Sequence, residues 1–266
     1  MTVTLYHTCA GKKERNRMKE DKNSHSSVDP EEVLQFDRNA DAWWDPEGIF
    51  KPLHGMNPCR IQILKNHLCT HFNKNPFDAK PLAGISILDI GCGGGLLTEP
   101  LTRLGATVTG LDAGASNIAI AEAHAEAMGL SIVYHAKTAE IFAAEGHQYD
   151  CVLSLEVLEH LASIPSFLNA CKKLLKPKGT LVLSTLNRTL KSFLGAVVMG
   201  EYVLKWLPRG THDWKKFLRP SELATLLKHE RLVVSSFVGM VYDPFIGEWK
   251  ETRSIDINYF AMITHY

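Results

Sequence analysis

The chain has 266 residues, with 29 basic and 29 acidic side chains and no formal net charge, which argues against a nucleic-acid partner, because such partners select a basic face. Its length suits one elaborated domain with a large core, and no run of about 18 apolar residues predicts a transmembrane helix. The six cysteines contain no C-x-x-C pair, which is typical of reduced thiols in a cytosol-like compartment.

The N-terminal segment differs from the rest of the chain. Residues 1–27 are polar, charged and without periodicity, so we expect a disordered tail before a single folded domain over residues 28–266. The basic residues of this tail suit a mitochondrial presequence. Glu14, Glu20 and Asp21 argue against one, because transit peptides contain few acids.

Two helices and a connecting loop are expected next. Asp29 and Pro30 have the residue types of an N-cap and a first helical turn, so a helix should begin there. Residues 42–54 combine two tryptophans with Pro and Gly, which predicts an irregular loop. That loop is either anchored to the core or a lid over a ligand site. A second helix should begin at Asn57 and Pro58.

A glycine cluster follows the first predicted strand. The apolar run at residues 85–90 is typical of a buried parallel strand. Gly91 and Gly93 begin a cluster that lets the backbone turn sharply and approach a ligand at the start of a helix. The next predicted strand ends at Asp112, about 20 residues later, where an acidic side chain meets a ribose hydroxyl in doubly wound folds. These features predict a nucleoside-binding unit.

The glycine spacing separates two kinds of nucleoside cofactor. A dinucleotide fingerprint needs a glycine where this chain has Leu96. Asp89, just before the first glycine, would repel a pyrophosphate but accept a hydrogen bond from the ammonium group of S-adenosylmethionine, while Asp112 holds its ribose. The Asp-x-Gly-x-Gly-x-Gly pattern resembles motif I of class I S-adenosylmethionine-dependent methyltransferases. The alternative is a tight turn without a ligand. It is weaker, because three glycines and two correctly placed acids would then have to occur together by chance.

The remaining chain alternates predicted strands and helices, which indicates a Rossmann-like α/β fold with a mostly parallel sheet. Ligands of such sheets bind beyond the carboxyl ends of the strands. The predicted strands are 85–90, 106–111, 130–135, 149–155, 179–185, 232–240 and 255–263, and the predicted helices after the first strand are 94–105, 116–128, 139–144, 163–175 and 220–228.

The candidate chemical site comes directly after the fourth predicted strand. In a helical turn, Glu156, Glu159 and His160 would stand at i, i+3 and i+4 on one face. Two carboxylates and an imidazole suit a divalent cation, with Mg²⁺ favoured by the oxygen ligands. Alternatively, His160 is a general base, since imidazole titrates near neutrality, or it is structural.

A long connection follows the fifth predicted strand. Residues 187–217 are roughly 30 residues where a short link is usual. Their apolar residues, with basic residues at the ends and Trp206 among them, suit a lid helix on the sheet or an amphipathic element that contacts a bilayer. One segment can do both.

With these residues in view, residues 28–264 resemble the UbiG family of ubiquinone-biosynthesis O-methyltransferases. The resemblance implies a class I methyltransferase fold, with a seven-stranded mostly parallel sheet, N-terminal helices and an insertion after strand five. Its most specific stretches are Trp43-Trp44-Asp45-x-Glu47-Gly48-x-Phe50-Lys51-Pro52-Leu53-His54, Asn57-Pro58-x-Arg60, the glycine motif, Ser184-Thr185-Leu186-Asn187-Arg188 and Gly210-Thr211-His212-Asp213.

The resemblance also implies an activity and site residues. The activity is methyl transfer from S-adenosylmethionine to phenolic hydroxyls of polyprenylated intermediates, at both O-methylation steps of ubiquinone biosynthesis. A divalent cation, expected to be Mg²⁺, would be held by Glu156, Glu159 and His160, which are the expected catalytic residues. The expected cofactor contacts are Arg60, Gly91, Asp112 and Leu155 from the resemblance, with Asp89 and Gly93 from the glycine motif.

The resemblance extends to partners and location. It implies peripheral membrane contact through residues 187–217, a polyprenylated phenol or quinol substrate, and contact with other ubiquinone-biosynthesis proteins. The expected location is the bacterial cytoplasm at the membrane, or the matrix face of the mitochondrial inner membrane. The rival functions are a nicotinamide-dependent oxidoreductase, a non-catalytic cofactor-binding scaffold, and a methyltransferase for another small phenol.

Overall fold

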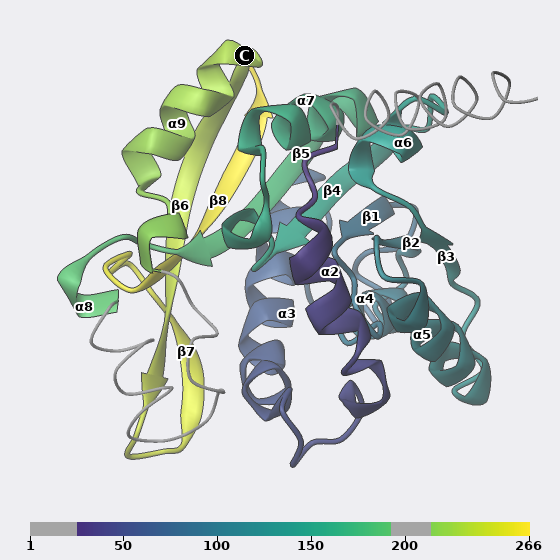
Figure 1. Ribbon diagram of the computed structural model, residues 1–266. Helices are drawn as coiled ribbons and strands as arrows, with labels where there is room; N and C mark the ends of the chain where they lie inside the picture. The colour runs from purple at the N-terminus through teal and green to yellow at the C-terminus, as the bar shows by residue number, and fades with distance from the viewer. Residues whose placement is uncertain (1–25, 193–213) are drawn as a thin grey trace, which may run out of the picture.

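The computed structural model describes residues 26–192 and 214–266. In this part of the chain, one sheet of 8 strands has the order β3-β2-β1-β4-β5-β8-β6-β7. Figure 1 shows β3 and α5 at one side of the molecule and the β6–β7 hairpin at the other. The strands are β1 (Ser86–Ile90), β2 (Thr107–Asp112), β3 (Val133–Ala136), β4 (Tyr149–Leu155), β5 (Leu175–Leu186), β6 (Leu232–Asp243), β7 (Glu248–Thr252) and β8 (Asn258–His265).

Strands β1 to β5 pair in parallel, whereas β8 pairs antiparallel with β5 and β6, and β6 with β7. The described α-helices are α2 (Pro30–Asp37), α3 (Lys51–His71), α4 (Thr98–Arg103), α5 (Ala115–Ala127), α6 (Ala139–Ala143), α7 (Ile164–Leu174), α8 (Leu190–Ser192) and α9 (Pro220–His229). The described 3₁₀ turns are η1 (Ala40–Ala42), η2 (Leu158–His160) and η4 (Trp214–Lys216).

The sheet is covered on both faces, because successive residues of its central strands point to opposite sides. Ile87 belongs to a core cluster with side chains of α3 and α4, whereas its neighbour Leu88 belongs to one with α6, α7 and α9. Both side chains are fully buried, and each such burial contributes about 1.5–3 kcal/mol. The predicted α/β fold is therefore confirmed, with helices packed on both faces of the sheet.

All the predicted strands are present, and most boundaries lie within a few residues of the predicted ones. The structure adds β7, whose polar sequence Glu-Trp-Lys-Glu-Thr has none of the apolar pattern that identifies a strand. The second helix begins at Lys51, so the predicted loop is wrong over residues 51–54. Pro58 lies inside α3 rather than at its start, because Pro52 already occupies the first turn, where a missing N–H costs nothing.

Two predicted segments fall largely outside the described residues. Residues 1–25 of the expected disordered tail are not described, while Ser27 is buried and its carbonyl accepts the backbone N–H groups of Ala162 and Ser163. Folded structure therefore begins before residue 28. Residues 193–213 of the expected insertion also lie outside the description. Among the residues that are described, no helix is both long and apolar enough to cross a membrane.

Candidate active site

The carboxyl ends of β1, β2 and β4 open into a cavity of about 330 Å³, a usual size for a small-molecule site. Helix α2 and the start of α3 form its other walls. Every residue that the sequence predicts for the site lies on this cavity. They are Arg60, Asp89, Gly91, Gly93, Asp112, Leu155, Glu156, Glu159 and His160.

The loop after β1 needs glycine for two reasons. Gly91 and Gly93 have φ values of +77° and +53°, which side-chain-bearing residues rarely adopt. A Cβ atom on Gly91 would also stand 2.4 Å from Val157 Cγ2, and one on Gly93 would stand 2.3 Å from Trp43 Cζ2. The backbone thus lies directly against its neighbours, and the cavity keeps its space only because these side chains are absent.

Asp112, at the end of β2, ties the glycine loop to the start of α5. Its Oδ2 accepts the backbone N–H of Gly93 at 3.0 Å, and its Oδ1 accepts the Gly114 N–H at 2.8 Å and the Asn117 side chain at 3.1 Å. Burial raises the pKa of Asp112, and these hydrogen bonds oppose that rise. A carboxylate has about four acceptor positions, so Asp112 can still accept from a ribose hydroxyl.

Arg60 and Asp89 are buried charged residues with unsatisfied polar atoms. Within the described chain, Arg60 Nε and Nη2 and Asp89 Oδ2 have no hydrogen-bond partner. Burial and the Asp112 charge raise the pKa of Asp89 to about 7, and Arg60 opposes that rise. A buried polar atom without a hydrogen bond is costly. The amino-acid end of S-adenosylmethionine has groups of the kind that these residues lack, a carboxylate suited to a guanidinium and an ammonium suited to Asp89.

Arg60 is predicted from the resemblance alone. It lies in α3, beside the buried residues Cys59, Ile63 and Leu64. The signal that the residue pattern offers is an arginine on the apolar face of a helix, where a charge needs a partner. That face is recognisable only when the true start of α3 is known.

The Trp43–Trp44 segment supports the glycine loop. Trp43 Nε1 donates to Asn117 Oδ1 at 2.8 Å, and its ring is stacked on Phe50 with centroids 3.9 Å apart. Trp44 Nε1 donates to the carbonyl of Gly94 at 2.9 Å. The anchored interpretation therefore holds for both tryptophans, although Trp43 also lines the cavity.

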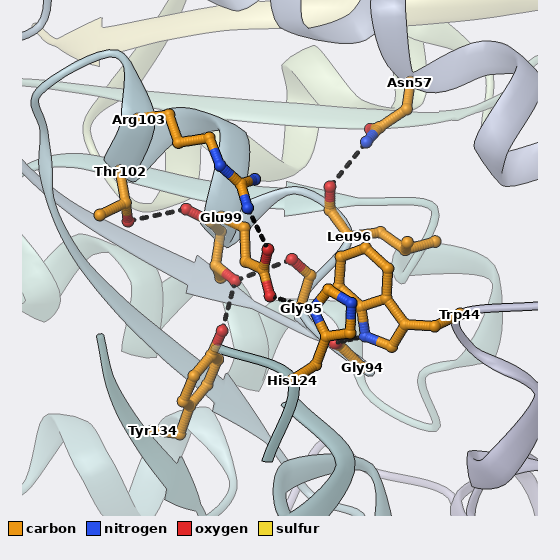
Figure 2. A network of polar contacts seen from close by, with 11 residues as sticks. Trp44, Asn57, Gly94, Gly95, Leu96, Glu99, Thr102, Arg103, His124 and Tyr134 are labelled. Atoms are coloured by element: carbon orange, nitrogen blue, oxygen red, sulfur yellow. Dashed lines mark hydrogen bonds and ion pairs between the residues drawn. The ribbon is translucent and has the colours of Figure 1, made fainter. Parts of the chain in front are cut away.

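Figure 2 shows the polar network around this loop, with side chains from α3, α4, α5 and the tryptophan segment. Glu99 is fully buried, accepts from Arg103 at 2.9 Å and contacts His124 Nδ1 at 2.5 Å. His124 in turn stacks on Trp44. Asn57 Nδ2 donates to the Leu96 carbonyl at 2.6 Å. The start of α4, the tryptophan segment and α3 therefore hold the loop from several directions.

The turn after β4 departs from its predicted geometry. Glu156 has a φ of +56°, a strained conformation for a residue with a side chain, and η2 is a 3₁₀ turn. Glu156 Oε1 accepts from Ser184 Oγ at 2.7 Å and lies 3.6 Å from Arg60 Nη2. Glu159 is buried and accepts from Thr185 Oγ1 at 2.9 Å. Burial and the Glu156 charge raise the pKa of Glu159.

The three predicted ion ligands consequently have separate partners. His160 Nδ1 pairs with Glu32 Oε2 at 3.0 Å, away from the serine and threonine that bind Glu156 and Glu159. The expected i, i+3, i+4 arrangement on one helix face is therefore wrong. In the described ranges, no three His, Cys, Asp or Glu side chains are placed together to hold an ion.

Sequence reasoning missed Glu32. This residue lies on α2, far from His160 in sequence, and also binds Lys216 Nζ at 2.8 Å. Burial acts to raise the pKa of Glu32, but the hydrogen bonds from Lys216 and His160 prevail and lower it. No local pattern links these three elements, because only the folded chain brings them together.

Comparisons with known proteins agree with this architecture. A family model described as a methyltransferase domain matches residues 64–233. Magnesium protoporphyrin IX methyltransferase from Synechocystis PCC 6803, solved with bound S-adenosylhomocysteine, shares the fold at a TM-score of 0.59 and 19% identity, with 88% of this chain and 94% of that chain covered. The plantazolicin methyltransferase BpumL gives a TM-score of 0.59 at 16% identity, covering 89% and 98%. The chain is a class I S-adenosylmethionine-dependent methyltransferase.

Sequence relatives identify the family within this class of methyltransferases. The chain is 47% identical over 240 residues to the ubiquinone biosynthesis O-methyltransferase of Bartonella bacilliformis, covering 90% of this chain and 97% of that protein. It is 46% identical to the mitochondrial ubiquinone biosynthesis O-methyltransferase of Arabidopsis thaliana, with 90% and 74% covered. The protein therefore belongs to the ubiquinone biosynthesis O-methyltransferase family, as the sequence resemblance predicts.

Proposed function

We propose that this protein methylates phenolic hydroxyls of polyprenylated ring intermediates at both O-methylation steps of ubiquinone biosynthesis, with S-adenosylmethionine as donor. Family membership supports the reaction class. One structural observation carries the proposal for this chain. The unsatisfied buried atoms of Arg60 and Asp89 line the same cavity as His160, so groups suited to the donor and to proton removal lie around one space.

The cofactor end of the cavity has distinct tasks for its residues. Arg60 binds the donor's carboxylate, Asp89 accepts from its ammonium, and Asp112 accepts from its ribose. Leu155, at the end of β4, provides apolar packing or a backbone contact for the adenine. When bound, the cofactor supplies an electrophilic methyl group on a cationic sulfur. The glycine loop fixes the position of that group, since its backbone is held on both sides.

At the other end of the cavity, His160 is the group that takes the proton of the phenolic hydroxyl, and its Nδ1 contacts Glu32. Glu159 and Glu156 shape this end from the carboxyl edge of β4. The remaining rate acceleration comes from holding the acceptor oxygen in line with the methyl carbon and sulfur. Val33 and Phe36 of α2 contribute apolar side chains to the lining of the cavity.

The divalent ion implied by the resemblance stays a prediction. Glu156, Glu159 and His160 are separately engaged, and this donor set does not fit an ion as placed, so we derive no step through one. Turnover of protein treated with a chelator and then supplied with Mg²⁺ tests the prediction directly.

Membrane contact, location and partners complete the proposal. A polyprenylated substrate is soluble in lipid, so the protein must meet it at a bilayer, and residues 187–217 are our candidate for that peripheral contact. The location would be the cytoplasmic face of a bacterial membrane or the matrix face of the mitochondrial inner membrane. Other ubiquinone-biosynthesis proteins are candidate partners there. Flotation with liposomes, with and without this segment, tests the contact.

Mass spectrometry of quinone intermediates in cells that lack the protein tests the proposed function. We expect the hydroxylated precursors of both O-methylation steps to accumulate, and reintroduced protein to remove them. Unchanged quinone intermediates would instead favour another small phenol as the substrate. A titration that compares NAD with S-adenosylmethionine separates the oxidoreductase alternative, which Leu96 already disfavours.

A further inference from the structure

The side chain of Asn117, in the first turn of α5, lies between the Trp43 indole and the Asp112 carboxylate. We propose that Asn117 is a positioning residue for cofactor binding, which holds Asp112 in the orientation that accepts a ribose hydroxyl of S-adenosylmethionine. The inference rests on the ribose contact that the proposed function assigns to Asp112. It deepens that function by naming the side chain that orients the carboxylate.

Two hydrogen bonds give the amide of Asn117 a single orientation. Trp43 Nε1 donates to Asn117 Oδ1 at 2.8 Å, and Asn117 Nδ2 donates to Asp112 Oδ1 at 3.1 Å. An indole N–H can only donate, and an ionised carboxylate can only accept. A reversed amide would place oxygen against oxygen at Asp112 and N–H against N–H at Trp43. The amide N–H₂ therefore faces Asp112.

The surroundings of Asn117 leave its side chain little room to move. Asn117 is only 2% exposed, although it lines the cavity. A Cβ atom added to Gly114 would stand 2.8 Å from Asn117 Nδ2 and 3.2 Å from Asp112 Oδ1. The Trp43 ring is itself stacked on Phe50. The amide is thus held by packing as well as by its hydrogen bonds.

The donors around Asp112 determine which oxygen meets the ligand. Oδ1 accepts from Gly114 N and from Asn117, whereas within the described residues Oδ2 accepts from Gly93 N alone. Each carboxylate oxygen has about two acceptor positions, so Oδ1 is filled and Oδ2 keeps one for a ribose hydroxyl. Loss of the Asn117 donor would open a position on Oδ1 and let the carboxylate turn.

Asn117 also favours the charged form of Asp112. Burial raises the pKa of Asp112, and the hydrogen bonds from Gly114, Asn117 and Gly93 oppose that rise. A hydrogen bond to an ionised carboxylate is roughly twice as strong as one between neutral groups. Removal of the Asn117 donor should therefore weaken the bond that Asp112 makes with a ribose hydroxyl.

A purely structural role for Asn117 has to be separated from this one. Asn117 also joins α5 to the tryptophan segment, and a loosened α5 would weaken the binding of every ligand by the same factor. S-adenosylhomocysteine and its 2′-deoxy and 3′-deoxy analogues distinguish the two roles, because they differ only in the hydroxyls that they offer to Asp112. We define the deoxy penalty as the larger of the two affinity losses that accompany removal of a hydroxyl.

Isothermal titration calorimetry with these three ligands tests the inference. In the wild type, the deoxy penalty should be about tenfold or more, the worth of a hydrogen bond to a charged group. Asn117→Leu keeps a side chain of similar size but has no donor for Asp112. In this variant the deoxy penalty should shrink by at least about threefold, because a free or neutral Asp112 accepts more weakly.

Two further comparisons keep the result specific. Asn117→Leu leaves the Trp43 N–H without its acceptor, so the same reduction should also be measured between Trp43→Phe and Trp43→Phe combined with Asn117→Leu. Asn169, on α7, is a matched control, because its Nδ2 donates to Glu230 Oε2 at 2.9 Å and it does not line the cavity. Asn169→Leu should keep the wild-type affinity and deoxy penalty.

The inference is overturned if the deoxy penalty stays at its wild-type value in Asn117→Leu, if it fails to shrink in the Trp43→Phe background, or if Asn169→Leu reduces it as much. Asp112→Asn separates the two levels of the argument. A wild-type deoxy penalty in Asp112→Asn overturns the ribose contact itself, whereas a penalty lost in Asp112→Asn but kept in Asn117→Leu overturns only the role of Asn117. Because binding alone is measured, failure to methylate prenylated phenols would leave this result unchanged.

Discussion

The two ends of the cavity are built in different ways. At the cofactor end, Asp89 and Asp112 lie at the ends of β1 and β2, the glycine loop follows β1 directly, and backbone N–H groups orient Asp112. At the acceptor end, His160 contacts Glu32 from α2, which in turn binds Lys216 from η4. The donor site is thus mostly local, and the acceptor site is mostly tertiary. Substitutions should therefore separate cofactor binding from turnover.

The largest expected effect on cofactor binding is at Gly93. Gly93→Ala places a Cβ about where the Trp43 ring lies, 2.3 Å from Cζ2, so the loop must move and S-adenosylhomocysteine affinity should fall by roughly 100-fold or more. Isothermal titration calorimetry measures this loss.

Gly129→Ala is the matched control for Gly93→Ala. Gly129 also has a positive φ, +67°, but a Cβ atom added there would meet nothing within 4 Å. We expect a loss of about 1–2 kcal/mol in unfolding free energy with unchanged cofactor affinity. Equal affinity for Gly93→Ala and the wild type would contradict the packed-loop account.

His160→Ala should affect the acceptor end alone. Loss of a general base lowers kcat by about 10²–10⁴-fold, while S-adenosylhomocysteine affinity should stay within about twofold of the wild type, since His160 is absent from the groups assigned to the cofactor. Single-turnover kinetics and calorimetry on the same preparation give both values. A parallel loss of binding would show that the two ends are not separable.

Arg60→Lys should weaken the cofactor end. Lysine keeps the charge but cannot form the planar two-point contact with a carboxylate, so affinity should fall by about 10–100-fold, the worth of a charged hydrogen bond. The kcat at saturating cofactor should change far less. An unchanged affinity would mean that the unsatisfied atoms of Arg60 do not face the ligand.

The pH dependence of binding should come from Asp89. Its pKa is raised to about 7 by burial and by Asp112, so a carboxyl that is largely protonated below pH 7 must ionise to accept the cofactor's ammonium. Affinity should therefore rise between about pH 5.5 and 7, by at most tenfold per pH unit. Asp89→Asn should remove this pH dependence of affinity. If the pH dependence persists in that variant, it comes from the ionisation of another group.

The raised pKa of Asp89 also determines whether the stability of the fold rises or falls with pH. A carboxyl whose folded pKa lies above its unfolded value stabilises the fold most below the unfolded pKa, and that contribution is lost as the pH rises through about 7. Between acid pH and pH 8, the cofactor-free wild type should therefore lose more stability than Asp89→Asn does. Thermal melts of both proteins across this range check the direction.

The smallest expected effect is that of a chelator on cofactor binding. Arg60, Asp89 and Asp112 bind through their own charges and hydrogen bonds, so S-adenosylhomocysteine affinity should change by less than about twofold in EDTA. A large loss of affinity would show that an ion belongs to the cofactor end of the cavity.

The contrast between the local cofactor end and the tertiary acceptor end of the cavity also explains which features the sequence could predict. Strands β1 and β2 and the glycine loop are recognisable because apolar runs, glycines and acids stand at fixed spacing. The predicted start of α3 is wrong because Pro58 is a usual helix start signal, yet it lies inside the helix. Strand β7 escapes prediction because an edge strand can be polar on both faces.

The acceptor end is predictable in its residues but not in its geometry. Glu156, Glu159 and His160 all reach the cavity, as their place after β4 indicates. The left-handed backbone of Glu156 is set by the packing of Val157 against Gly91 and by the bonds to Ser184, which a helical template does not contain. Glu32 has no detectable pattern, because its partners lie on distant elements.

The central claim is most directly tested by methyl transfer in a purified system. The protein would be incubated with S-adenosylmethionine carrying a deuterated methyl group and a short-chain prenylated catechol, and the products analysed by mass spectrometry. The account predicts a singly labelled methyl ether and an equal amount of S-adenosylhomocysteine, with labelled product forming about 10²–10⁴-fold more slowly with His160→Ala. Tight cofactor binding by the wild type without any labelled ether would contradict it and indicate a non-catalytic scaffold.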